Sequence, residues 1–272
     1  MSMQVIDWPD FLDNDKQSGD SAMTIGFFDG VHLGHQALIQ KIVSNGQNPT
    51  VITFRECPKK VLSPETYKGD VFSLKQKLNA FEQRGVSRVV LIDFSGNFSK
   101  LNGRDFLDLL EKQGEMAFLV IGSNFRCGYH KGMDAEAIAA VNELKGIPTE
   151  VLAPVNIPPE FGTGPVNSSR IRSAVVSGDL RMAAVLMGRN FELDISGCSS
   201  RDAQCGGSGV KVYDLDSVPQ VIPPDGQYPV KTNPGYVKSL ALIQGKKLRL
   251  SVIPEGEAIN RADSYAGSLE FI

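Results

Sequence analysis

The sequence predicts an α/β protein with a helix-covered parallel sheet, followed by a small antiparallel β-barrel-like domain. Two observations predict this fold class. Up to about residue 187, short apolar runs alternate with amphipathic helical segments, which is the pattern of βαβ units. After Gly188 the helical periodicity stops, and turns that contain Pro and Gly separate short β-like runs. We therefore expect two domains, over residues 1–187 and 188–272.

The alternating pattern assigns each element in order along the chain. Strands are expected at 22–27, 50–54, 88–92, 118–122 and 149–152. Helices are expected at 35–45, 73–84, 104–112, 134–145, 168–177 and 179–187. In the second domain the β-like runs cover 227–231, 236–243, 247–253 and 268–272, whereas 194–211 shows little periodicity. Ligands of parallel sheets bind at the carboxyl ends of the strands, so we expect the functional residues there.

Composition and charge narrow the possible partners. The chain has 272 residues, 42% of them hydrophobic and 22% charged, and a net charge of −3, which gives no indication of a nucleic-acid partner. No signal-peptide pattern and no apolar run long enough to span a membrane is present, so we expect a cytoplasmic protein without a membrane partner. The oligomeric state stays open. The cysteines form no C-x-x-C pair and are expected to be reduced thiols, at positions 57, 127, 198 and 205.

A glycine-rich turn with two histidines stands where the first predicted strand passes into a helix. The turn covers 26–35 and reads GFFDGVHLGH. A helix N-terminus offers unpaired N–H groups and a positive dipole end, and glycine lets the backbone approach a ligand closely. His32 and His35 are three residues apart, so both can face the same side of the first helical turn. We interpret the turn as a site for a nucleoside triphosphate; the alternative is two histidines that merely cap a helix.

The segment FDGVHLGH at 28–35 resembles the signature of the prokaryotic FAD synthetase family. The shorter H-x-G-H within it resembles that of the wider nucleotidyltransferase superfamily. The resemblance implies a Rossmann-like nucleotidyltransferase domain that transfers AMP from MgATP to FMN, giving FAD and pyrophosphate. It implies catalytic roles for His32 and His35. It also implies ATP contacts from Gly26, Phe28, Asp29, Gly30, His32 and His35.

A second candidate for phosphate binding, the segment VNSSRIR at 166–172, opens one of the predicted helices. Ser168 or Ser169 would cap this helix, and arginine suits bidentate contact with phosphate. Arg170 and Arg172 are two positions apart and point in different directions, so we expect one of them to reach the triphosphate. The segment resembles the family's I-S-S-T-R-I-R motif, which assigns Ser168, Ser169 and Arg172 to ATP and gives Arg172 a catalytic role. A plain N-cap with solvated arginines is the alternative.

The segment GSNFRCG at 122–128 follows a predicted strand. It resembles the family's G-x-[ND]-F-x-F-G element, which implies flavin contacts from Asn124 and Phe125. Cys127 stands where the family usually has Phe. The third histidine, His130, is expected to be a solvated loop residue.

The segment TFRECP at 53–58 resembles the family's T-F-x-P-H-P loop, which lies near the flavin. The resemblance implies flavin contacts from Phe54 and Pro58. Glu56 and Cys57 replace the usual Pro and His, which puts the detail of these contacts in doubt. A core position for Phe54 is the alternative.

The carboxyl-terminal domain resembles the family's riboflavin kinase barrel only at its start. Residues 186–191, LMGRNF, are similar to the family's L-L-G-R-x-[YF]. The P-T-A-N motif, whose Thr and Asn coordinate magnesium and ATP phosphate in the family, does not occur in the sequence. We therefore expect FAD synthesis without riboflavin kinase activity.

The resemblance implies small-molecule substrates, ATP with its Mg²⁺ and FMN, and no metal site built from protein side chains. Three other functions stay open. The chain could transfer an adenylyl or cytidylyl group to another phosphorylated acceptor, such as phosphopantetheine, nicotinamide mononucleotide or a phosphoalcohol, which H-x-G-H alone supports equally. It could bind flavin or nucleotide without turnover. It could also retain riboflavin kinase activity, with catalytic residues that the sequence does not reveal.

Overall fold

The computed structural model describes residues 2–13, 19–45, 47–94, 97–205, 208–233, 236–253 and 267–272. The chain divides into two compact units, and each is described by itself. The first comprises Met1–Tyr67, Leu74–Asn156 and Thr163–Val166, and the second comprises Lys68–Ser73, Ile157–Gly162 and Asn167–Ile272. Compactness thus groups the helices within 168–187 with the second unit. The domain boundary expected after residue 187 stays a prediction.

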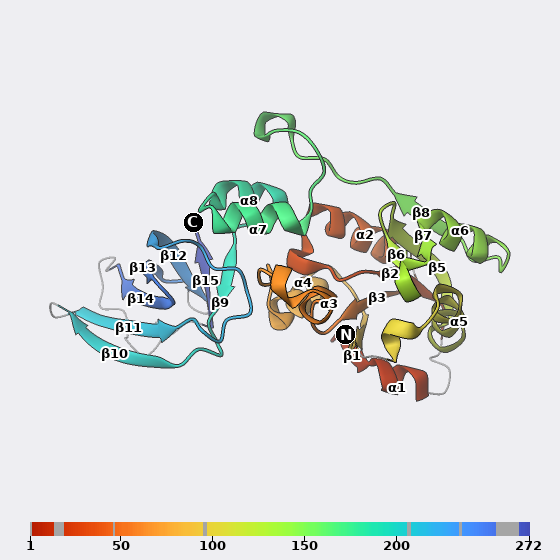
Figure 1. Ribbon diagram of the computed structural model, residues 1–272, viewed down its shortest axis with the longest axis horizontal. Coiled ribbons are helices and arrows are strands. Elements are labelled where there is room, and N and C mark those ends of the chain that lie inside the picture. The colour runs from red at the N-terminus through yellow and green to blue at the C-terminus, as the bar shows by residue number, and fades with distance from the viewer. Residues whose placement is uncertain are drawn as a thin grey trace. The chain divides into compact units, whose positions relative to one another are not determined.

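A six-stranded sheet, parallel throughout, forms the centre of the first unit (Figure 1). Its strands run in the order β1-β4-β3-β2-β5-β8. The chain continues from β2 to β3 on one side and returns to β5 on the other, so the strand order reverses between β2 and β5. In sheets of this kind the ligand crevice lies outside the carboxyl ends of the strands at that point. The strands are β1 (Gln4–Asp7), β2 (Ser21–Ile25), β3 (Asn48–Phe54), β4 (Arg88–Ile92), β5 (Met116–Gly122) and β8 (Thr149–Leu152).

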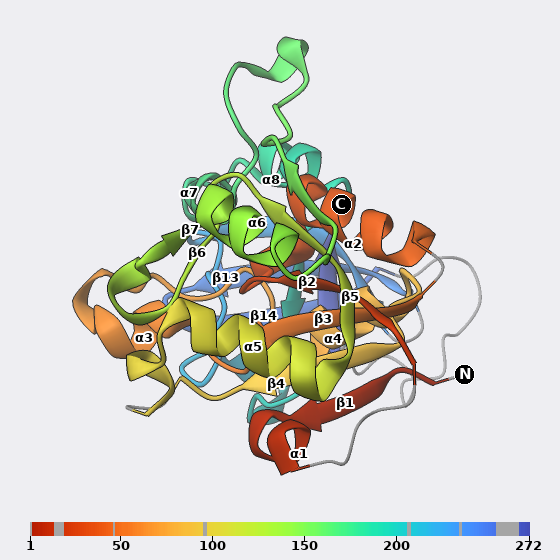
Figure 2. The same ribbon diagram turned by 90° about the vertical axis from the view of Figure 1, so that its right-hand side faces the viewer.

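Both faces of this sheet are buried, as its continuous apolar strands predict. Every residue of β2 is buried, and alternate residues Met23 and Ile25 enter a cluster with Phe11 of α1, Leu110 of α5 and Ile138 of α6. Helix α2 contacts β2, β3 and β5. In Figure 2, α5 crosses in front of the sheet, and α1 lies next to the edge strand β1. The helices are α1 (Trp8–Asp13), α2 (Leu33–Ser44), α3 (Pro58–Leu62), α4 (Leu74–Glu82), α5 (Gly103–Gly114) and α6 (Ala135–Glu143).

The strands and helices predicted for this unit are confirmed, with ends that shift by up to two residues. The structure adds elements that the sequence pattern did not indicate. Strand β1 has four residues at the sheet edge, three of them exposed, so it has no continuous apolar run. Helix α3 buries none of its residues and therefore shows no amphipathic stripe. A short hairpin, β6 (Arg126–Cys127) and β7 (Met133–Asp134), follows β5.

The second unit is built on a seven-stranded antiparallel sheet in the order β10-β11-β14-β13-β12-β15-β9. This sheet confirms the predicted antiparallel β-domain, and helices α7 (Ser168–Val176) and α8 (Leu180–Met187) precede it. Gly188, with φ 69°, ends α8 in the left-handed conformation that glycine favours. The strands are β9 (Glu192–Asp194), β10 (Ser200–Cys205), β11 (Ser208–Asp214), β12 (Gly226–Asn233), β13 (Lys238–Gln244), β14 (Lys247–Val252) and β15 (Ser268–Phe271).

Strand β10 and the first half of β11 lie in the region 194–211, where the sequence showed little periodicity. Strand β10 is polar and pairs along its whole length with β11, from Ser200–Tyr213 to Cys205–Ser208. None of the residues 200–203, whose burial the structure describes, is buried, and backbone pairing forms this edge strand, so hydrophobic alternation does not reveal it. Cys57, Cys127 and Cys198 are free thiols, as expected, whereas the side chain of Cys205 lies outside the described part of the chain.

Candidate functional site

Left-handed backbone shapes the turn between β2 and α2. Phe28, Gly30 and Val31 have φ values of 55°, 71° and 37°. Gly30 adopts this conformation without a Cβ penalty, but at Phe28 and Val31 it is strained and persists only because the surroundings fix it. The buried Phe28 ring packs edge-on against Phe81, with centroids 5.6 Å apart, and a Cβ at Gly26 would lie 3.2 Å from the Phe28 ring. Packing around one aromatic ring therefore holds the turn.

The two histidines meet at the N-terminus of α2. His32 is the N-cap residue, and its Nδ1 accepts a hydrogen bond from the His35 backbone N–H at 3.4 Å. The two rings stack with centroids 3.5 Å apart, and Phe28 meets His35 edge-on at 5.1 Å. Because Nδ1 of His32 accepts, a neutral His32 ring carries its proton on Nε2 and can donate from there. The expectation that both imidazoles share one side of the first turn is confirmed.

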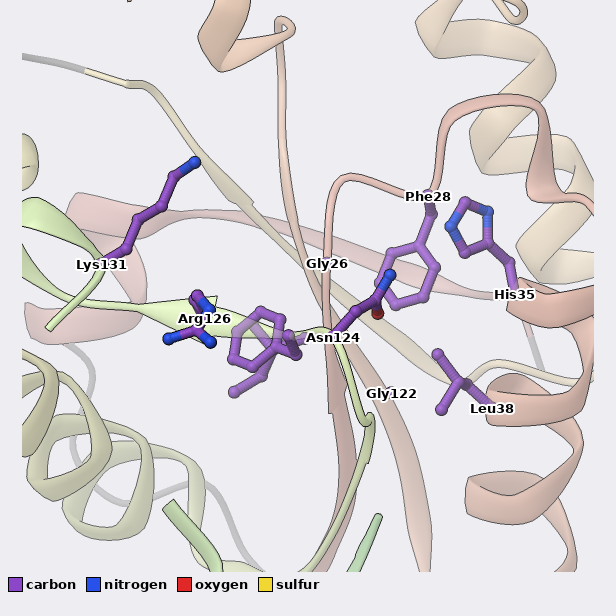
Figure 3. A pocket seen from close by; sticks show the side chains of 10 residues that line it. Gly26, Phe28, His35, Leu38, Gly122, Asn124, Arg126 and Lys131 are labelled. Carbon is purple, nitrogen blue, oxygen red and sulfur yellow. The ribbon is translucent and has the colours of Figure 1, made fainter. Parts of the chain in front are cut away.

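A cavity of about 340 Å³ lies at the carboxyl ends of β2 and β5, where the strand order reverses. This volume lies within the usual range for small-ligand sites. The cavity brings together five of the predicted residues, Gly26, Phe28, His35, Asn124 and Phe125. The full lining is Ile25, Gly26, Phe28, His35, Leu38, Gly122, Asn124, Phe125, Arg126 and Lys131 (Figure 3).

Among the lining residues that were not predicted from the sequence, two carry positive charge, Arg126 and Lys131. Figure 3 shows them on the side of the cavity opposite His35, with Asn124 between the two sides. Both side chains are exposed. The Arg126 guanidinium Nη1 lies 3.8 Å from Oδ2 of Asp134. Lys131 has a left-handed backbone, with a φ of 56°. Arg126 stood within the 122–128 motif and could have been noticed there, whereas only the fold brings Lys131 to the cavity. One side of the cavity therefore carries cations that suit a phosphate- or carbonyl-bearing ligand.

Cys127 follows the cavity residue Arg126 and packs against the hydrophobic core of the first unit. Burial raises the pKa of the Cys127 thiol to about 11. The side chain therefore stays a neutral, apolar thiol near neutral pH. It fills its position as a small hydrophobic residue, where the family usually has Phe.

The loop after β3 does not contribute to this cavity. Phe54 packs among aromatic rings, 6.0 Å from Phe94 and 5.8 Å from Phe98, and borders the core cluster. Pro58 is the first residue of α3, and Cys57 before it is buried. Neither Phe54 nor Pro58 is among the lining residues. The structure thus fits the alternative of Phe54 as a core residue, and the flavin contacts expected from both residues stay predictions.

Ser168, Ser169 and Arg172 belong to α7 of the second unit. The expectation that one of the serines caps this helix is wrong. Asn167 is the N-cap, and its side chain accepts the Arg170 N–H at 2.9 Å, because one of the orphan N–H groups of the first turn lies within its reach. Arg172 donates from Nε to the Gly69 carbonyl at 2.8 Å. The ATP contacts of these three residues stay predictions.

The described residues offer neither a membrane span nor a cluster of metal ligands. No helix in these ranges is both long and apolar enough to cross a membrane. Across the same ranges, no three His, Cys, Asp or Glu side chains are grouped so that they could hold a metal ion.

Known proteins resemble both the sequence and the fold. A family model described as FAD synthetase matches residues 14–163, which is more than half of the chain. In solved structures, the fold is similar to that of a macrolide-efflux protein from Streptococcus pneumoniae, with a TM-score of 0.78 at 21% identity over 99% of this chain and 89% of that one. At this identity the likeness shows the fold alone.

Curated relatives carry the name bifunctional riboflavin kinase/FMN adenylyltransferase. The protein of Buchnera aphidicola (strain APS) is 26% identical over 65% of this chain and 56% of its own length. Those of Bacillus subtilis (strain 168) and Escherichia coli (strain K12) are each 29% identical, over 65% and 63% of this chain and 56% and 55% of their own lengths. The alignments thus span about half the length of these relatives. The extent of the family-model match decides the assignment: this chain belongs to the FAD synthetase family.

Proposed function

We propose that the protein transfers AMP from MgATP to FMN and releases pyrophosphate, so that FAD forms. The observation that carries the proposal is the stacked His32–His35 pair at the N-terminus of α2, with His35 lining the cavity at the strand-order reversal. Family membership and the names of the curated relatives support this reaction for the chain.

In the proposed reaction an FMN phosphate oxygen forms a bond to the α-phosphorus of ATP. The bond from that phosphorus to the bridging oxygen breaks, and the electron pair leaves with pyrophosphate. The attacking phosphate is already anionic, so no general base is needed, and catalysis rests on positioning and on stabilising negative charge. Mg²⁺ arrives as part of the MgATP substrate.

The residues of the first unit have distinct proposed roles. His32 and His35, together with the N–H groups of the first turn of α2, stabilise charge on the α- and β-phosphates. Asn124 donates to ribityl or phosphate oxygens of the substrates, and Arg126 and Lys131 add positive charge at the far side of the cavity. The role proposed for Ser168, Ser169 and Arg172, which is to hold the leaving pyrophosphate, rests on the resemblance of their segment to the family motif.

We further propose that riboflavin kinase activity is absent, because the P-T-A-N motif does not occur in the sequence. One experiment tests both proposals: the pure protein is incubated with MgATP and either FMN or riboflavin, and the products are separated by chromatography. We expect FAD from FMN and no product from riboflavin. FMN or FAD formed from riboflavin would show a kinase site, as the bifunctional relatives suggest. No FAD from FMN would contradict the main proposal and favour another phosphorylated acceptor or a binding role.

A further inference from the structure

Lys77 of α4 is a buried lysine that the proposed mechanism does not use. Only 3% of the residue is exposed. An ammonium group taken out of water is costly unless hydrogen bonds replace its hydration. The contacts made by Lys77 therefore indicate its structural role.

The Lys77 ammonium joins the ends of two neighbouring strands. Its Nζ donates to the Phe54 carbonyl at 2.7 Å and to the Phe27 carbonyl at 3.3 Å. Phe54 is the last residue of β3, and Phe27 comes two residues after β2 ends. The same Nζ lies 4.5 Å from the centroid of the Phe27 ring, a favourable cation–π contact.

The Phe27 carbonyl accepts a second hydrogen bond, from Thr53 Oγ1 at 3.1 Å. This carbonyl and the N–H of Phe28 belong to one planar peptide unit, so fixing the oxygen also fixes the plane from which Phe28 starts. Phe28 then takes the left-handed φ of 55° that begins the turn to His32 and His35. Two donors thus determine the direction of the chain just before the strained turn.

We infer that Lys77 is a positioning residue for the histidine pair. Its ammonium holds the Phe27–Phe28 peptide plane against β3, and this plane sets the turn that brings His32 and His35 into their stacked arrangement. The consequence for turnover rests on the proposed function, whereas the effect on the histidine rings does not.

The test is Lys77→Met, which keeps an unbranched side chain only one heavy atom shorter and removes its charge and donors. The protein has three histidines, so the C2–H signals of His32, His35 and His130 can be assigned by NMR. Each stacked ring shifts the signals of the other through its ring current. In the Lys77→Met protein we expect the His32 and His35 signals to move and the His130 signal to stay. We also expect kcat for FAD formation to fall roughly tenfold or more.

Lys75→Met is the matched control, because Lys75 is exposed on the same helix, and it should change neither the signals nor kcat. Leu110→Ala, in the core cluster of the same unit, controls for lost stability and should lower the melting temperature while His32 and His35 stay stacked. If Lys77→Met does not fold, Thr53→Val removes the other donor to Phe27 and should move the same two signals by less. Unchanged His32 and His35 signals in the folded variant would overturn the inference. A wild-type protein without FAD synthesis would overturn only the proposed function, since the NMR comparison still tests the positioning.

Discussion

Each compact unit contains a long buried polar side chain that hydrogen-bonds to backbone carbonyls from separate segments, and the two differ in what they hold together. In the first unit Lys77, 3% exposed, donates to the carbonyls of Phe27 and Phe54, next to the turn that carries the histidines. In the second unit Gln220, 4% exposed, donates from Nε2 to Val71 at 2.8 Å and to Glu192 at 2.9 Å.

The side-chain amide of Gln220 also accepts a hydrogen bond through its oxygen. Its Oε1 accepts the Asp194 N–H at 2.8 Å, and its backbone forms a parallel bridge with Asp70. Gln220 therefore joins the segment 68–73 to β9, and none of these hydrogen-bond partners is a residue proposed to contact substrate. A buried polar group can thus either fix the geometry of a turn or join separate segments of a domain. Which of the two roles applies depends on where the carbonyls that accept its hydrogen bonds lie in the fold.

The largest effect is expected from a substitution within the turn itself. His35→Ala removes a ring that lines the cavity and stacks on His32, so kcat for FAD formation should fall roughly tenfold or more while the protein stays folded. The measurement is steady-state kinetics with FMN and MgATP, together with circular dichroism. His130→Asn is the control, since His130 is exposed and Asn tolerates its left-handed φ of 54°. Equal turnover of His35→Ala and wild type would show that His35 has no catalytic role.

Gln220→Ala should separate stability from activity. The change leaves the carbonyls of Val71 and Glu192 and the N–H of Asp194 without this partner, which should destabilise the protein by about 3 kcal/mol. The melting temperature should fall by roughly 5–10 °C. At temperatures well below melting, kcat should stay at the wild-type value. Calorimetry and kinetics at low temperature check this expectation.

Gln227→Ala provides the matched control, because Gln227 is an exposed glutamine of β12 in the same unit. It should change neither quantity. A tenfold loss of kcat in folded Gln220→Ala would show that Gln220 also serves the reaction, and the contrast with Lys77 would be lost.

Much of the fold was accessible from the sequence because the central strands are continuous apolar runs. Strand β4, Arg88–Ile92, is buried throughout, and the prediction has the same bounds. Elements whose formation depends on pairing escaped prediction. Strand β1 and the polar strand β10 lie at the edges of their sheets, where neighbours supply the hydrogen bonds and no apolar pattern is required.

The candidate site was predictable where residues adjacent in sequence build it. The turn with His32 and His35 is such a stretch: the two rings stack, and Gly26, Phe28 and His35 line the cavity, whereas Asp29, Gly30 and His32 are not among the lining residues and their ATP contacts stay predictions. Lys77 was not predictable, because the pattern LKQKLNAFE of α4 places two lysines close together and only the tertiary fold shows that one is buried. Gln220 lies outside the helices and strands, so no periodicity indicates its burial.

Cys127 in the first unit and Cys198 in the second have differently placed thiols, and this predicts that they affect the stability of the protein differently at alkaline pH. Burial raises the pKa of Cys127 in the first unit from 9.0 to about 11. For Cys198 in the second unit, burial again raises the pKa, but a hydrogen bond with Ser217 opposes the change. Between pH 9 and 11 the unfolded chain loses the Cys127 proton while the folded protein keeps it, so stability falls as pH rises.

Cys127→Val should remove this loss, which we expect to be about 1 kcal/mol between pH 9 and 10 after allowance for partial exposure. Cys198→Val should remove a smaller part of the loss of stability at alkaline pH. Urea unfolding of the three proteins at pH 8, 9 and 10 measures both differences. Identical pH dependence in wild type and Cys127→Val would show that Cys127 titrates as an ordinary thiol.

The smallest effects should come from exposed ion pairs, and here the two units should behave alike. Arg55 bridges Asp7 and Asp93 in the first unit with 35% of its side chain exposed, and Lys246 pairs with Asp216 at 3.1 Å in the second with 69% exposed. Water screens both pairs, so Arg55→Gln should cost at most about 1 kcal/mol and Lys246→Gln close to nothing. Urea unfolding at low and high salt checks this, because added salt should reduce the Arg55 effect further. A larger, salt-insensitive loss for Arg55→Gln would mean that the Arg55 side chain stabilises the protein through its packing and not through its charge.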